Sequence, residues 1–145
     1  MIRKMINVHK EQQGAVAVEF ALLLPILAVL LFGAVEFGAI LYDKAVVTNA
    51  SREGARFGAV YREPGEEITC GDINTVVQNY TTGHLITFGG GGPADPTYPL
   101  GCDPGSGNEL TVRVSYDYDY LVLPNLVTSL IGPITLVGET TMIKE

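Results

Sequence analysis

The stretch "GAVAVEFALLLPILAVLLFGAVEFG", residues 14–38, decides the architecture of this 145-residue chain. It is apolar on every face of a helix and holds two ionisable side chains, Glu19 near its start and Glu36 near its end. A soluble helix normally keeps a polar stripe, whereas the hydrocarbon core of a bilayer needs about 20 apolar residues in a row. The sequence therefore predicts a membrane-spanning helix over 15–42, with Pro25 tolerated because the segment lies in lipid.

The charges on either side of this helix predict its orientation. Residues 1–14 form a short basic leader with a net charge of +2. The rest of the chain carries −9, which together with the leader gives the net charge of −7. Positive residues before an apolar run favour a cytoplasmic N-terminus, so the domain over 63–145 is expected to be extracytoplasmic. The acidic balance argues against a nucleic acid as partner.

The apolar run fits a retained anchor better than a cleaved signal peptide. A signal peptidase site has small residues just after the apolar core. Cleavage after Ala34 would place Phe32 three residues back, and the apolar run continues to Leu41. We therefore expect a single-pass protein of the inner membrane, in contact with membrane lipid.

Helical spacing continues beyond the membrane over 43–62. Arg52 and Arg56 lie one turn apart on this extension. Two interpretations are open: a positive patch that contacts a partner, or pairing within the helix, which is the commoner use of such residues. Pro64 and Gly65 then mark the end of the helix.

The remaining residues predict an α+β domain in which a short helix packs on a small antiparallel sheet. The helix is expected over 72–81 with Asp72 as its N-cap. Strands are expected over 85–88, 110–123 and 133–145, and the Gly- and Pro-rich segment 89–108 is expected to be loop.

The strongest strand alternates cleanly, with Tyr116, Tyr118 and Tyr120 on one face and Asp117 and Asp119 on the other. The tyrosines could bind carbohydrate, but core beneath a helix is the commoner outcome of such a pattern. Two carboxylates alone fall short of the 6–8 oxygens that calcium takes.

Cys70 and Cys102 are the only cysteines, and both fall on the extracytoplasmic side. A pair in an oxidising compartment predicts a disulfide. Zinc held by these cysteines and His84 would lack a fourth ligand and matches no known ligand spacing. No metal and no cofactor is therefore predicted.

Catalysis is not expected. The chain has two histidines, one of them in the leader, and it shows no nucleophile elbow, metal-ligand pair or phosphate loop. A structural or assembly subunit is the first interpretation, and a membrane-anchored extracytoplasmic binding module is the alternative.

Several motifs stacked over residues 14–60 make the chain resemble the TadE-like minor pilins, or pseudopilins, of the tight-adherence (Tad/Flp) pilus. They are the Gly14 junction, Glu19-Phe20, Pro25, the triplet over 36–38 and the segment "NASREGAR" over 49–56. The resemblance implies cleavage by prepilin peptidase between Gly14 and Ala15, a step in the making of a pilus used for adhesion.

The resemblance also implies a docking role for Glu19 and Phe20. In pilin-like assemblies a carboxylate five residues into the mature chain pairs with the N-terminal amine of a neighbouring subunit. The implied partners are other pilin and pseudopilin subunits, prepilin peptidase and the inner-membrane pilus assembly platform. A carboxylate in lipid is then tolerated because a cation of the next subunit neutralises it.

Overall fold

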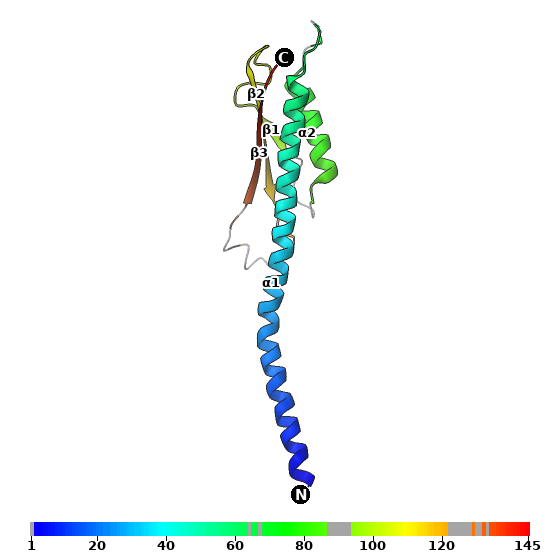
Figure 1. Cartoon of the computed structure of the whole chain (residues 1–145), viewed down its shortest axis with the longest axis vertical. Coiled ribbons are helices and arrows are strands. Elements are labelled where there is room, and N and C mark those ends of the chain that lie inside the picture. Colours follow the sequence, from blue (N-terminus) through cyan, green and yellow to red (C-terminus); the bar gives the residue numbers. More distant parts are fainter. Residues whose placement is uncertain are drawn as a thin grey trace.

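The structure is a computed structural model that describes residues 2–63, 65–66, 68–86, 94–121, 129, 132 and 134–145, with side chains from residue 14 onward. Figure 1 shows a long helical rod that carries a small α+β domain on the half nearer its C-terminal end, which confirms the predicted fold class. The elements are α1 (Ile2–Ala59), α2 (Cys70–His84), β1 (Asp95–Thr97), β2 (Glu109–Tyr118) and β3 (Ile134–Ile143).

The helix α1 has two halves with different surroundings. From Gly14 to Val35 its side chains are almost all exposed, and no other element packs against them. From Glu36 onward a buried residue recurs every three or four positions up to Ala59. The face that the domain covers therefore begins at Glu36, inside the range 15–42 that was expected to span the membrane.

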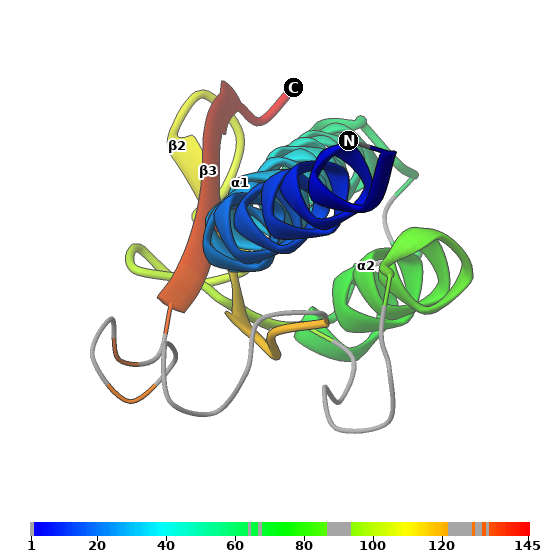
Figure 2. The same ribbon diagram turned by 90° about the horizontal axis from the view of Figure 1, so that it is seen from below.

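The domain packs around α1, with the sheet on one side of the helix and α2 on another (Figure 2). Its centre joins α1, α2 and β2 through small residues of α1. A methyl group added at Gly54 would lie 2.7 Å from the side chain of Val77, and one added at Gly58 would lie 2.5 Å from that of Leu110. Glycine at these positions lets α2 and β2 approach the helix closely.

The sheet has the order β1-β2-β3 with antiparallel pairing throughout. The inner face of β2 is buried, as its alternation predicts: Leu110, Val112, Val114, Tyr116 and Tyr118 are each at most 3% exposed. Tyr116 and Tyr118 are thus core residues beneath α1, and β2 ends at Tyr118 rather than at residue 123.

The outer face of the sheet is polar and satisfied by its own cross-strand pairs. Arg113 of β2 forms an ion pair with Glu139 of β3, and Asp117 accepts a hydrogen bond from the hydroxyl of Thr135. Exposed pairs of this kind contribute little stability, so the fold depends on the inner face.

The boundaries of α2 differ from the prediction. The helix runs from Cys70 to His84, and its N-cap is Thr69 rather than Asp72. The Thr69 hydroxyl accepts from the Asp72 backbone N–H at 3.3 Å, and the Asp72 carboxylate accepts from the Thr69 backbone N–H at 2.8 Å. Asp72 therefore completes a capping box from the third helical position.

Two strand assignments also differ. The segment Asp95–Thr97, expected to be loop, pairs with β2 as the short strand β1. Leu85 and Ile86, expected to begin a strand, lie in no strand, and Leu85 caps the C-terminal end of α2. Residues 87–88 of that prediction lie outside the described residues.

The strand β3 crosses directly over the backbone of α1. A methyl group added at Gly138 would lie 2.6 Å from the carbonyl oxygen of Val47 and 2.8 Å from the Cα of Thr48. The hydroxyls of Ser51 and Thr140 lie 2.8 Å apart nearby, so the two elements are also joined by a hydrogen bond. Only glycine fits at this crossing, because rigid backbone rather than a side chain occupies the space.

We expect Gly138→Ala to destabilise the domain by about 1–3 kcal/mol, the usual cost of overpacking a rigid contact. Thermal unfolding of the detergent-solubilised chain measures the change. Gly83→Ala is the matched control, because a methyl group there meets no atom within 4 Å and a helical alanine adds up to about 1 kcal/mol. Equal effects of the two substitutions would contradict the backbone contact.

Candidate functional site

The residues that the resemblance singles out lie on the bare half of α1. Glu19 and Phe20 are exposed, and an added methyl group at Gly14 would meet nothing within 4 Å. In the part of the chain that the structure describes, the Glu19 carboxylate has no hydrogen bond and no ion pair. The structure thus keeps Gly14, Ala15, Glu19 and Phe20 together on one helix and away from the domain (Figure 1).

Arg52 and Arg56 lie on the side of α1 that the domain leaves open. Arg56 forms an ion pair with Glu53 at 2.6 Å. The Nη1 atom of Arg52 donates a hydrogen bond to the Asn49 side chain at 3.4 Å. The hydrogen bond from Arg56 lowers the pKa of Glu53. This is the pairing within the helix that the spacing favoured, and both guanidinium groups remain on the exposed surface.

The predicted disulfide between Cys70 and Cys102 is present, with the two Cα atoms 5.3 Å apart. It ties the first turn of α2 to the loop that precedes β2. The Tyr98 hydroxyl reinforces this junction by donating to the Asn74 side chain at 2.5 Å. The two cysteines are 32 positions apart. Closing a loop of this length lowers the entropy of the unfolded chain and so stabilises the folded state by about 3–4 kcal/mol.

From the sequence alone, Glu36 had no role beyond its place near the end of the apolar run and in the motif over 36–38, and the structure gives it one. Its side chain is buried, at 1% exposure. Its Oε1 accepts a hydrogen bond from the Tyr118 hydroxyl at 2.7 Å and another from the Leu121 backbone N–H at 2.9 Å. Glu36 therefore attaches the end of β2 to the helix at the first position where the domain covers α1.

Two further residues of α1 hold the other elements. Asp43 is fully buried, and its Oδ1 accepts the Ile86 backbone N–H at 2.9 Å, just after α2 ends. Lys44 donates to the carbonyl oxygen of Val137 in β3. We call Glu36, Asp43 and Lys44 the base clasp, because they fix β2, the segment just after α2 and β3 to one short stretch of α1.

The signal for the base clasp was available in the sequence. Glu36 and Asp43 are seven residues apart, and Ala50 continues the same spacing. Residues at i and i+7 share one face of a helix, so both acids lie on the face that Ala50 also buries. The apolar residues around Glu36 hid this periodicity, because nearly every position there looked buried.

The base clasp region is negatively charged and poorly solvated. Burial raises the pKa of Asp43, since the Ile86 hydrogen bond compensates only in part, and its Oδ2 has no hydrogen-bond partner among the residues that the structure describes. Burial is also the largest cause of the raised pKa values of Tyr116 and Tyr118, and the carboxylate of Asp43 adds to both. The phenols therefore stay protonated, and Tyr118 remains a donor to Glu36.

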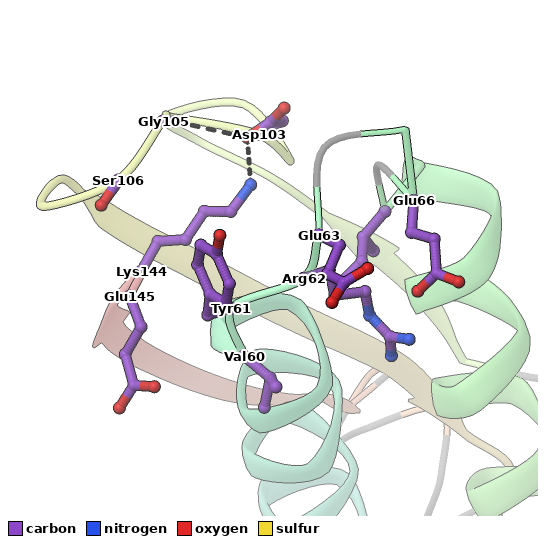
Figure 3. Close-up of a pocket in the computed structure, with 11 residues that line it drawn as sticks. Val60, Tyr61, Arg62, Glu63, Glu66, Asp103, Gly105, Ser106, Lys144 and Glu145 are labelled. Carbon is purple, nitrogen blue, oxygen red and sulfur yellow. Dashed lines mark hydrogen bonds and ion pairs between the residues drawn. The ribbon is translucent and has the colours of Figure 1, made fainter.

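A pocket of about 270 Å³ lies at the opposite end of the domain, past the last turn of α1 (Figure 3). Tyr61, Arg62 and Glu63 line it together with the turn that contains Asp103 and with Lys144. Lys144 and Asp103 form an ion pair there. Among the residues that the structure describes, no group of three His, Cys, Asp or Glu side chains is placed to hold a metal ion.

The comparison with protein families agrees with the resemblance seen in the sequence. The model of the TadE family, described as TadE-like protein, matches residues 14–56. The match covers the bare half of α1, the base clasp and the exposed Arg52 and Arg56. No curated protein and no solved structure matches the chain.

We expect Tyr118→Phe to lower the stability of the domain by about 1.5–3 kcal/mol, because it removes a hydrogen bond to a buried carboxylate. Tyr116→Phe is the matched control: the same inner face buries it, and its hydroxyl makes no hydrogen bond within the described part of the chain. Chemical unfolding in detergent micelles measures both. A Tyr118 variant as stable as the Tyr116 variant would show that the Glu36 contact contributes nothing.

We expect Asp43→Asn to stabilise the protein at neutral pH. A raised pKa means that the folded state disfavours the charged carboxylate, so the penalty is present above the folded-state pKa and disappears as pH falls through it. Asparagine keeps the acceptor for Ile86 without that penalty. The difference in Tm between variant and wild type should be positive at pH 7 and shrink toward pH 4; a difference that does not change with pH would contradict this explanation.

Proposed function

We propose that this chain, which is TadE-like over residues 14–56, is a minor pilin-like subunit that is processed after Gly14 and takes part in assembling a Tad/Flp-type adhesion pilus. One observation carries the proposal. The exposed apolar half of α1 presents Glu19 with no partner in the described part of its own chain. The long apolar helix fits a single-pass membrane anchor.

The chemistry of the proposed site is electrostatic. Processing after Gly14 frees an amine on Ala15, four residues from Glu19 and thus about 6 Å along the helix axis. A charged side chain at the centre of a bilayer costs about 2.5–3.5 kcal/mol on insertion scales, and a position nearer the edge of the hydrocarbon costs part of that. The amine of a neighbouring subunit offsets that cost for Glu19, and the pairing sets the register between the two helices.

The bare helix also suits close packing with other pilin-like helices. Ala15, Ala17 and Ala21 place small side chains near the docking carboxylate, and small residues let membrane helices approach each other. The proposed partners are pilin and pseudopilin subunits, prepilin peptidase and the inner-membrane assembly platform. The domain lies on the extracytoplasmic side in this arrangement.

Arg52 and Arg56 are a second proposed contact with a partner subunit. Both side chains lie on the open side of α1, and Arg56 is already paired with Glu53. A partner carboxylate would add to this pair and would also meet Arg52, whose only hydrogen bond in the described structure is the long one to Asn49. The contact would guide orientation rather than supply most of the affinity.

The alternative function is a membrane-anchored binding module. The pocket near Tyr61 favours it, because residues just past the last turn of α1 line this pocket, far along the chain from the bare half of the helix. A plain anchored module needs no processing at Gly14, so the mature N-terminus separates the two functions.

The test is made in cells that produce the whole pilus machinery. We expect mass spectrometry of the membrane-extracted protein to find Ala15 as the N-terminal residue. Glu19→Gln should leave the protein in the membrane but reduce pilus assembly, because the amide cannot neutralise the partner amine. Glu63→Gln, an exposed acid in the domain, is the control and should assemble normally.

An uncut N-terminus together with normal pili would overturn the processing step. Normal assembly of the Glu19 variant would overturn the pairing. Loss of assembly in both acid-to-amide variants would show that the effect is not specific to the helix position.

A further inference from the structure

The two acids of the apolar stretch define where a bilayer fits on α1. Glu19 and Glu36 are the first charged groups on either side of an uncharged run, and their midpoint lies beside Leu27. A hydrocarbon core of about 30 Å centred there covers about ten residues in each direction at 1.5 Å per residue. Its outer edge then falls near Phe37, and the headgroup layer extends about three to five residues further, as far as Tyr42.

The base clasp spans this layer, from Glu36 at the edge of the hydrocarbon to Asp43 and Lys44 just past Tyr42. Glu36 is about 13 Å from the centre of the core, at the edge of the hydrocarbon. Its hydrogen bonds to Tyr118 and Leu121 bring the end of β2 to the same depth. No linker separates the membrane helix from the domain, since the residue at the lipid boundary is also the first one that the domain buries.

The open side of α1 at this level is apolar. Phe37, Leu41 and Tyr42 are 62%, 54% and 46% exposed. They continue the exposed apolar surface of the bare half into the first turns that carry the domain. Tyrosine with its polar tip is the residue type enriched where hydrocarbon meets water, and Asp43 and Lys44 follow it immediately.

We propose that the membrane-proximal end of the domain is seated in the headgroup layer of the bilayer, with Phe37, Leu41 and Tyr42 as interfacial anchors on the open side of α1. The occupant of this surface is the lipid interface. Two observations support lipid as the occupant: the exposed apolar surface continues from the bare half of α1, and Glu36 lies at the edge of the hydrocarbon. The inference rests on the membrane anchor of the proposed function and adds that the domain is held against the membrane.

Tryptophan fluorescence tests how deep each part of α1 lies in the bilayer. The chain contains no tryptophan, so a single introduced tryptophan reports on its own position. The full chain is placed in phosphatidylcholine vesicles whose acyl chains carry bromine at a deep or a shallow position. Four single-tryptophan variants are compared: Leu27→Trp, Phe37→Trp, Tyr42→Trp and Tyr61→Trp. All four positions are at least 46% exposed, so the substitutions leave the core intact.

We expect deep bromines to quench the Leu27 variant most and shallow bromines to quench the Phe37 variant most. The Tyr42 variant should show weaker quenching by shallow bromines and a blue-shifted emission compared with the Tyr61 variant. The Tyr61 variant, at the far end of the domain, is the aqueous control and should be quenched by neither lipid.

Two results would overturn the seating of the domain. Phe37 and Tyr42 variants that behave like the Tyr61 variant would show that the domain stands clear of the lipid. Blue-shifted emission that is not quenched by bromine, and that reverts when the protein is diluted into excess lipid, would show that a second copy covers the surface. Failure of the Leu27 variant to be quenched would instead overturn the membrane anchor on which the proposed function rests.

Discussion

The hydrogen bonds that the buried Glu36 carboxylate accepts from Tyr118 and from the Leu121 backbone determine how the rest of the molecule is arranged. They fix the end of β2 to the helix at the first residue that the domain buries. Because α1 continues without a break from Ile2 to Ala59, the bare helix and the face that carries the domain belong to one continuous helix.

The contacts between helix and domain change in kind along α1. The base clasp uses buried polar groups, while Val47, Ala50, Gly54 and Gly58 further along make apolar and close-backbone contacts. This order has a physical reason. In the membrane setting proposed above, apolar burial gives little driving force beside lipid, which is itself apolar, whereas a buried carboxylate needs its hydrogen-bond donors wherever water is scarce. Apolar packing becomes effective higher on the helix, where exposed side chains would face water.

How much of this was predictable from the sequence depended on how clearly each pattern stood out from its surroundings. The alternation in β2 was visible because polar residues separate its apolar ones, so its buried tyrosines followed. The disulfide followed from a cysteine pair with no competing ligand set. Glu36 and Asp43 were missed because seven-residue periodicity cannot be seen in an almost uniformly apolar segment. Thr69 was missed because its capping box ends in aspartate rather than the usual glutamate, and β1 because Pro96 makes an edge strand resemble a loop.

The same helix places two glutamates near the two edges of one apolar run, and their surroundings differ. Glu36 receives its donors from its own chain, so its carboxylate is already satisfied in a single subunit. Glu19 receives none from the described part of its own chain, and in the proposed assembly its cation is the amine of another subunit. An acid whose partner is in the same chain specifies a fold, whereas an acid with no partner in the described part of its chain fits the assembly role proposed for Glu19. This difference between two chemically identical side chains, seventeen positions apart on one helix, is the strongest physical reason to expect that the protein acts as one subunit among several.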